Sequence, residues 1–210
     1  QSLHERNQAI TLNLETIRRQ VTQLTTVHQA SVTIANASLL DMNQLLDTVL
    51  ELIVRNLGFS KMMVVLSNSE TNSASIARIM GVSPQIEEAV RRLHVPIVDN
   101  GGLTSDLLLH GKPILVHDVE KITHRFYPPL LELVRRSGIQ SFVMAPLQSH
   151  GKILGYLGGD RGSQQCTDED LNILLTIAGH VAAAIDNAKA YSDLAELTQH
   201  LEERIEQRTE

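Results

Sequence analysis

The chain has 210 residues, and 42% of them are hydrophobic, which is enough to build the core of one domain with extensions or of two small domains. Its 18 basic and 24 acidic side chains leave a net charge of -6, and no basic run is longer than a pair, so a nucleic-acid partner is not expected. The single cysteine excludes a disulfide framework and a thiolate metal site.

Membrane-targeting patterns are also missing from the sequence. No uninterrupted apolar stretch approaches the roughly 18 residues of a membrane span, and the N-terminal residues are polar and unlike a signal peptide. We therefore expect a cytoplasmic segment that does not insert directly into a membrane, an expectation that leaves open a membrane-tethered parent protein.

Residues 1–37 are predicted to form a coiled-coil helix. This segment is rich in Gln, Thr and Asn and contains neither Gly nor Pro. Apolar residues recur along it at alternating steps of four and three, a repeat of about 3.5 residues that is typical of coiled coils. These residues are Ile10, Leu14, Ile17, Val21 and Leu24. We expect this seam to pair with the same seam of a second copy in a parallel homodimer.

The middle of the chain changes from helical to strand patterns. Residues 39–57 carry one wide apolar face, with Asp41 as the predicted N-cap and Gly58 just past the end. Six strands are predicted at residues 61–68, 74–81, 93–98, 112–118, 140–147 and 153–160, with hairpin turns at SETNS and SHGK. Further helices are predicted after Ser83 and between Pro128 and Gly138.

The chain ends in one long predicted helix that begins at the cap Thr167 and continues to Glu210. At about 1.5 Å per residue it would span roughly 60 Å, so half of it is expected to extend beyond the domain. Its first half carries a dense apolar stripe, and its second half a thinner seam that includes Leu194, Leu197 and Leu201. We expect this seam to form a coiled-coil linker to an output domain in the same chain.

The order of these elements predicts an α+β fold, with an antiparallel sheet and the terminal helices packed on one of its faces. The predicted domain organisation has three parts. They are an N-terminal helix over residues 1–37, a globular domain over residues 38–191 and a linker over residues 192–210.

Stretches within residues 38–191 resemble the GAF domain, a small-molecule sensor module of bacterial signalling proteins. The resemblance rests on GGLTSDLLLHGKPILVHDV from Gly101, SGIQSFVMAPLQSHGKILGYLGGDR from Ser137 and CTDEDLNILLTIAGHVAAAIDNAKAY from Cys166. It implies a PAS-related, six-stranded antiparallel sheet, a ligand pocket on the side opposite the terminal helices, and dimers formed through those helices. The segment EKITHRFYPP lacks the N-K-F-D-E motif of cyclic-nucleotide-binding members, and Cys166 stands where the family usually has an aromatic residue, which disfavours bilin attachment.

Two groups of candidate ligand-binding residues lie in the connections. Leu103 and Ser105 follow a glycine pair at the start of a predicted helix, where N–H groups can bind an anion, although such a pair is more often a simple turn. His124, Phe126 and Tyr127 lie in the loop that the resemblance places over the pocket.

A third group lies on the strand SFVMAPL. Ser141, Val143 and Ala145 are expected to share one face, with Phe142, Met144 and Leu147 largely on the other and Pro146 disturbing the alternation. We expect the smaller set, with Ser141 and Val143, to line the pocket because small side chains leave room for a ligand.

Metal and catalytic motifs are weak in this sequence. His110, His117 and His124 recur every seven residues, but a predicted strand separates the first two, so we expect solvated or hydrogen-bonded side chains rather than metal ligands. Asp118 is expected to cap or turn the chain after its strand. There is no G-x-S-x-G elbow, Walker loop, H-E-x-x-H or kinase catalytic motif, and we expect neither enzymatic activity nor a cofactor in this segment.

These patterns predict a sensory and dimerisation module of a bacterial signal-transduction protein, with a histidine kinase as the expected parent. In this hypothesis an unidentified small molecule in the pocket shifts the packing of the coiled-coil helices. Two alternatives stay open: a dimerising spacer with a collapsed pocket, and the regulatory domain of a cyclic-di-nucleotide cyclase or phosphodiesterase.

Overall fold

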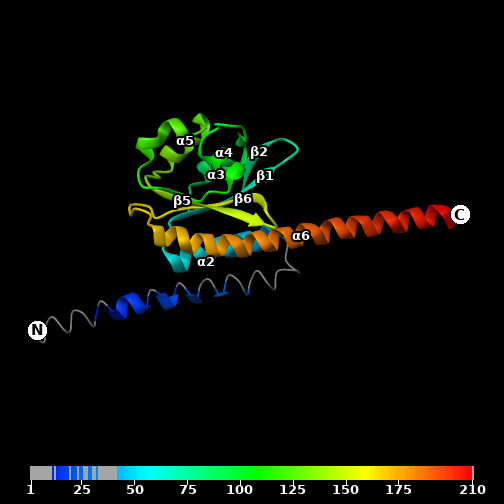
Figure 1. The fold of residues 1–210 in the computed structure, drawn as a ribbon, viewed down its shortest axis with the longest axis horizontal. Coiled ribbons are helices and arrows are strands. Elements are labelled where there is room, and N and C mark those ends of the chain that lie inside the picture. Colours follow the sequence, from blue (N-terminus) through cyan, green and yellow to red (C-terminus); the bar gives the residue numbers. More distant parts are fainter. Residues whose placement is uncertain are drawn as a thin grey trace, which may run out of the picture.

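The computed structural model describes residues 11, 13–18, 20–22, 24–25, 28–29, 32 and 42–209. Residues 42–209 form an α+β fold in which a six-stranded antiparallel sheet lies between two layers of helices. Helices α2 and α6 cover one face, and α3, α4 and α5 cover the other (Figure 1). The predicted fold class and the placement of the terminal helices α2 and α6 on one face are therefore confirmed.

The sheet has the strand order β3-β2-β1-β6-β5-β4, and all neighbouring strands are antiparallel. The strands are β1 Lys61–Asn68, β2 Ser73–Met80, β3 His94–Pro96, β4 Ile114–Val116, β5 Phe142–Ser149 and β6 Lys152–Asp160. All six predicted strands exist, but β3 and β4 are shorter than predicted. Pro96 ends β3 and Pro113 precedes β4, and a proline cannot donate to a strand ladder.

The two predicted hairpin turns are confirmed, and they join β1 to β2 and β5 to β6. His150 and Gly151 adopt φ angles of 48° and 76° in the second turn, a left-handed geometry that suits a tight reversal. Pro146 lies inside β5 and pairs with Tyr156 of β6. It is tolerated there because β4 pairs with β5 only as far as Met144, so the missing N–H of Pro146 leaves no gap in that ladder.

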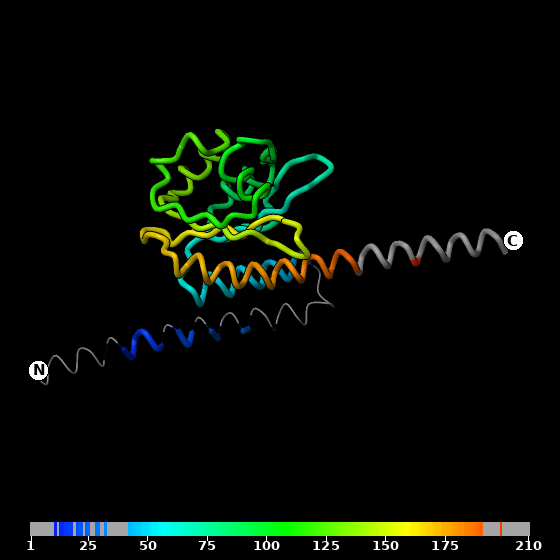
Figure 2. Tube along the Cα trace, viewed as in Figure 1, coloured from blue at the N-terminus to red at the C-terminus, as the bar shows by residue number. Residues whose placement is uncertain are grey.

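The first helical layer consists of α2 (Met42–Leu57) and α6 (Asp168–Thr209), which lie side by side under the sheet in Figure 2. Gly58, with a φ of 74°, ends α2 as predicted. The predicted cap of α6 is also confirmed, because the Asp170 N–H donates to Thr167 Oγ1 at 3.3 Å and Asp170 Oδ2 accepts from the Thr167 N–H at 2.8 Å. This layer buries a core that includes Leu46, Ile53, Val143, Ala145, Leu157, Leu174, Ile177, Ala178 and Val181.

The first part of α6, Asp168–Ala190, is long and apolar enough to cross a membrane by length and composition alone. Its apolar side chains, however, pack against the sheet, and Leu174, Ile177 and Val181 are all fully buried. Burial in the core of the domain accounts for the composition of this helix. The helix then continues to Thr209 through the predicted domain boundary at residues 191 and 192.

The second helical layer contains α3 (Pro84–Arg91), α4 (Leu103–His110), the 3-10 segment η2 (Val119–Arg125) and α5 (Pro128–Arg136). Ser83 caps α3, and Gly138, with a φ of 68°, follows α5, both as predicted. Asp118 caps η2 by accepting a hydrogen bond from the Glu120 N–H at 3.0 Å, which confirms its expected capping role.

The described residues of the N-terminal segment are helical and exposed. Four of the predicted seam residues are among them, and their exposed fractions are 57% for Leu14, 55% for Ile17, 55% for Val21 and 70% for Leu24. Ile10 and the predicted cap Asp41 lie outside the described residues. Leu194, Leu197 and Leu201 lie within α6, and the pairing of both seams in a homodimer stays a prediction.

Candidate ligand pocket

A cavity of about 80 Å³ lies between the second face of the sheet and the helices that cover it. A single water needs about 10–15 Å³, so this space can hold a small organic molecule. The floor of the cavity is formed by the strand residues Met63, Ile76, Ile79, Met144, Tyr156 and Gly158. Its walls come from α3, α4, α5 and the segment that precedes α5, and include Ile86, Val90, Leu103, Phe126, Tyr127, Leu130, Leu133 and Val134.

Local sequence patterns explain how the walls are built. In α3, Ile86 and Val90 are four residues apart, so both side chains point to the same face of the helix, toward the sheet. In α5, Leu130, Leu133 and Val134 follow the same helical spacing. Each helix therefore buries one apolar stripe over the sheet, and the space that these stripes leave unfilled is the cavity.

Ion pairs on the outside hold the covering segments together. Arg125 Nη2 donates to Asp106 Oδ2 at 2.8 Å and joins the end of η2 to α4. Arg135 in α5 makes a two-point pair with Glu120 in η2, at 2.9 and 2.6 Å. The hydrogen bonds from Arg135 lower the pKa of Glu120 below its ordinary value. Phe126 packs edge-on against Phe142 of the sheet, with ring centroids 5.9 Å apart.

A buried hydroxyl group lies in the floor of the cavity. Tyr156 is only 2% exposed, and this burial raises its pKa to about 12, while a hydrogen bond with Thr104 acts in the opposite direction. The phenol is therefore neutral at physiological pH. Thr104 lies in the first turn of α4, so this bond ties α4 to the middle of the sheet.

A buried ion pair lies at one end of the cavity, between the first residue of β1 and the last residue of β6. Lys61 Nζ lies 3.3 Å from Asp160 Oδ2, which also accepts the N–H of Gly162 at 2.9 Å. The side chains of Lys61 and Asp160 are 17% and 1% exposed. This ion pair was not predicted from the sequence. A sequence signal for Asp160 did exist. Tyr156, Gly158 and Asp160 are spaced two residues apart in a predicted strand, so all three lie on the same face of that strand.

Three of the seven predicted ligand-binding residues line the cavity, namely Leu103, Phe126 and Tyr127. Ser105 is buried elsewhere, where its Oγ donates to the Pro96 carbonyl at 3.2 Å and accepts from the Val98 N–H at 3.3 Å. It thus joins α4 to the end of β3 and does not face the cavity. His124 lies in η2 with an exposed side chain and is not among the lining residues.

The expectation that Ser141 and Val143 line the cavity is wrong. Val143 packs with α2 and α6 on the other face of the sheet, while Phe142 and Met144 face the cavity. Ser141 Oγ donates to the Val116 carbonyl at 2.8 Å and accepts from the Cys166 N–H at 2.9 Å, so its hydroxyl forms hydrogen bonds within the core. Small side chains on this strand allow the closely packed α6 to approach; they do not leave room for a ligand.

The structure gives no support to a metal site at the three histidines, an anion site at the start of α4 or a reactive Cys166. His110, His117 and His124 are all exposed, and within the described residues no three His, Cys, Asp or Glu side chains are grouped to hold a metal ion. At the start of α4, a Cβ on Gly102 would collide with the Arg125 carbonyl, so η2 covers this helix end closely. Cys166 is buried, and its burial raises the pKa of the thiol, which suits a core side chain.

Comparison with protein families shows that residues 41–185 match the GAF domain model. Since this match spans more than half of the chain, the chain belongs to the GAF domain family. Members of this family are typically sensory and regulatory modules of signalling proteins.

Solved structures show the same fold. The GAF domain of a phosphoenolpyruvate-protein phosphotransferase from Coxiella burnetii is 19% identical, with a TM-score of 0.68 over 82% of this chain and 98% of that chain. A methyl-accepting chemotaxis protein fragment, residues 122 to 287, is also 19% identical, with a TM-score of 0.65 over 77% and 98%. A free methionine-R-sulfoxide reductase from Neisseria meningitidis, solved with its substrate, is 16% identical, with a TM-score of 0.65 over 80% and 91%. The fold is thus shared by signalling modules and by an enzyme. Comparison with curated proteins found no match.

Proposed function

We propose that this segment is the sensory and dimerisation module of a bacterial signal-transduction protein, in which the contents of the cavity set the arrangement of α6. The observation that carries the proposal is the position of the cavity. It lies on one face of the sheet. Helix α6 packs on the opposite face and then continues past the sheet (Figure 1). A molecule in the cavity is therefore separated from the output helix by a single layer of strands.

Strand β5 supplies a direct path between the two sides. Met144 lines the cavity, and its neighbours Val143 and Ala145 pack in the core that α6 covers. Side chains alternate between faces along a strand, so a shift of β5 caused by a ligand must move both faces together. Because the α6 side is closely packed, it responds by a change in helix position.

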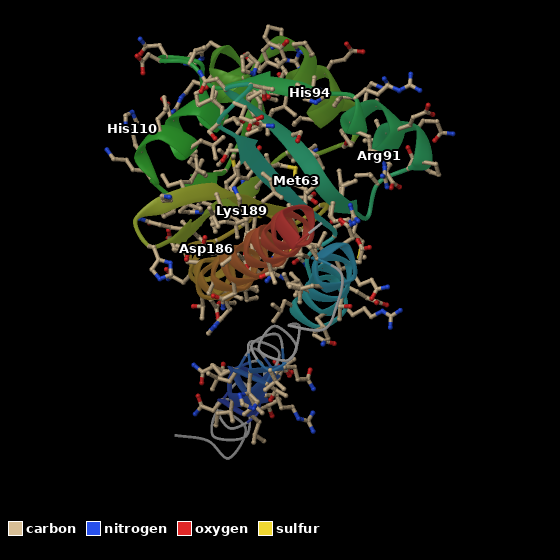
Figure 3. The ribbon with its side chains drawn as sticks, turned by 90° about the vertical axis from the view of Figure 1, so that its right-hand side faces the viewer. Met63, Arg91, His94, His110, Asp186 and Lys189 are labelled. Atoms are coloured by element: carbon tan, nitrogen blue, oxygen red, sulfur yellow. The ribbon has the colours of Figure 1, made fainter. Side chains whose placement is uncertain are left out.

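The β5–β6 hairpin provides a second link. Ser149 Oγ donates to Asp186 Oδ2 at 2.9 Å, and His150 Nδ1 lies 2.8 Å from the same oxygen. These hydrogen bonds, first that of His150 and then that of Ser149, lower the pKa of the Asp186 carboxyl. Asp186 and Lys189 lie on α6, on the opposite side of the sheet from Arg91 and His110 (Figure 3). The tip of the hairpin is thus fastened to α6.

In the proposed mechanism the two terminal seams pair in a parallel homodimer in the cytoplasm, and α6 leads to an output domain, which we propose to be a histidine kinase. The 55–70% exposure of Leu14, Ile17, Val21 and Leu24 supports pairing, because a single chain leaves this apolar seam in water. A ligand that prefers one arrangement of the helices shifts the population toward it. A coupling of about 1–3 kcal/mol is typical of such systems.

The test is a fusion of residues 1–210 to a reporter kinase, with insertions of one, two or three residues after Leu194. Each insertion rotates the downstream helix relative to the upstream seam, so kinase activity should change with the number inserted. An insertion of seven residues restores the heptad register and serves as the matched control. Activity that is the same for all four insertions would contradict transmission through α6.

The dimerising spacer is the main competing function. Phe126 and Tyr127 do pack inward against the apolar cluster on the cavity side, as a collapsed pocket would require, but the cavity of about 80 Å³ remains. Val90→Phe fills this space from α3. In the same reporter fusion, Val90→Phe should alter kinase activity if the cavity controls α6 and should leave it unchanged if the domain is only a spacer.

A further inference from the structure

Only one of the two carboxylate oxygens of Asp160, at the end of the cavity, has hydrogen-bond partners among the described residues. Asp160 is 1% exposed, and its Oδ2 receives both Lys61 and the Gly162 N–H. Its Oδ1 is buried and has no hydrogen-bond partner among the described residues. A buried acceptor without a donor is unfavourable, and most such groups in folded proteins are paired.

Strand geometry places this acceptor on the cavity side. Tyr156, Gly158 and Asp160 alternate along β6 with Leu157 and Gly159, which face the core under α2 and α6, so they share the other face, and all three line the cavity. Their partners on β1 follow the same rule, because Lys61 pairs with Asp160 and Met63 pairs with Gly158. Met63 lies in the middle of the sheet (Figure 3). The cavity is thus a mostly apolar chamber with the Asp160 carboxylate and Lys61 at one end; its other polar lining residues are Thr104, Arg125 and Ser137.

We infer that the pocket selects small, largely apolar molecules that carry an N–H or O–H donor, and that this donor binds Asp160 Oδ1. This inference rests on the proposed function of the cavity as a ligand pocket and names the class of ligand. A hydrocarbon would fill the apolar chamber but leave the acceptor unpaired. An anionic group at this end would meet the carboxylate and be repelled, even with Lys61 nearby.

The test compares three probes of nearly equal size: toluene, phenol and aniline, which differ only in a methyl, hydroxyl or amino group. Their dissociation constants are measured with the 210-residue chain by titration, with amide chemical shifts as the readout. A purely apolar pocket would prefer toluene, because the other two must give up hydrogen bonds to water. With the carboxylate as acceptor, phenol and aniline should bind about tenfold or more tightly than toluene.

Two variants of the acceptor and one control sharpen the result. Asp160→Leu removes the acceptor and should abolish the preference for phenol and aniline. Asp160→Asn keeps the shape with a neutral acceptor and should reduce the preference, which keeps the test valid if Asp160→Leu does not fold. Ile86→Val changes only the apolar wall in α3. It should raise the dissociation constants of all three probes by similar factors and leave the ratios between them unchanged.

The possible outcomes are separable. Two results would overturn the assignment of Asp160 while leaving the pocket itself in place. One is that the wild type binds toluene more tightly than phenol and aniline, and the other is that the preference for phenol and aniline persists in Asp160→Leu. Failure of all three probes to bind would overturn the cavity as a ligand pocket, and this inference with it. The insertion experiment after Leu194 tests signal transmission independently of either result.

Discussion

On one face of the sheet α2 and α6 pack closely, whereas on the other face α3, α4 and α5 leave a cavity. The same strands supply both faces, but with different side chains. Along β5, the side chains toward α6 include the smaller Val143 and Ala145, and those toward the cavity include the larger Phe142 and Met144. On this strand, small residues mark close helix packing, while large side chains surround the open space because the covering helices do not interdigitate with them.

The largest effect is expected where α6 is anchored. Asp170→Asn leaves the buried Arg161 guanidinium without its charged partner, and breaking a buried ion pair costs about 3–5 kcal/mol. Burial alone would raise the pKa of Asp170, but hydrogen bonds from Arg161 and Thr167 outweigh it and hold the pKa below its ordinary value of 3.8. The stabilisation is therefore present above pH 3.8 and is lost as the pH falls through the lower folded value.

Urea unfolding of wild type and Asp170→Asn at neutral and acid pH measures this effect. The difference in unfolding free energy should shrink as the pH falls below 3.8. A difference that stays constant with pH would show that the cost of the substitution does not come from the charge of Asp170.

Truncation of a buried aliphatic side chain should cost more on the closely packed face. Ile177 in α6 is fully buried, and Leu133 in α5 borders the cavity with 8% exposure. We expect Ile177→Ala to lower the free energy of unfolding by about 4 kcal/mol and Leu133→Ala by about 2 kcal/mol, within the range known for such substitutions. The difference arises because the cavity side is already loosely filled. Equal losses in urea unfolding would remove the distinction between the two faces.

Adjacent glycines in β6 offer a matched pair of smaller changes. A Cβ on Gly159 would meet first the sulfur of Met62, which is only 1% exposed, and then the Phe59 ring carbon Cδ1 at 2.8 Å, in the core next to α2. A Cβ on Gly158 would instead meet Met63 Cε at 2.8 Å beside the cavity. The end of Met63 can move into open space, but the Phe59 ring cannot. We expect Gly159→Ala to destabilise by about 1–3 kcal/mol and Gly158→Ala by less than about 1 kcal/mol. Thermal unfolding of the two variants measures these losses. A larger loss of stability in Gly158→Ala than in Gly159→Ala would contradict the prediction.

The smallest effect is expected from the hydroxyl in the cavity floor. Tyr156→Phe removes its hydrogen bond with Thr104 and should cost about 1 kcal/mol at neutral pH. The pKa of Tyr156 is raised to about 12 from 10.0, so its contribution is complete below pH 10 and is lost as the pH rises toward 12. Wild type should therefore lose more stability than Tyr156→Phe over this alkaline range. Parallel losses in both proteins would contradict burial of the neutral phenol.

Much of the fold could be predicted because its signals are local. Thr167 caps α6, Ser83 caps α3, and Gly58 and Gly138 end their helices, each through contacts or backbone angles within a few residues. The alternation of apolar residues likewise located all six strands, although prolines shorten β3 and β4 and β5 lies two residues further along the chain than predicted. Of the cavity-lining residues, Phe126 and Tyr127 were found through the resemblance to a known family, and Leu103 through the glycine pair that precedes its helix.

What the sequence by itself determined is the set of elements, their caps and turns, and which residues of a strand share a face. Only the tertiary structure decided which face meets α6 and which meets the cavity, and so assigned Phe142 and Met144, not Ser141 and Val143, to the cavity. It also brought Lys61 and Asp160 together from opposite ends of the sheet-forming region. The physical reason is that caps and periodicity depend on neighbours along the chain, whereas the identity of a packed surface depends on segments distant in sequence.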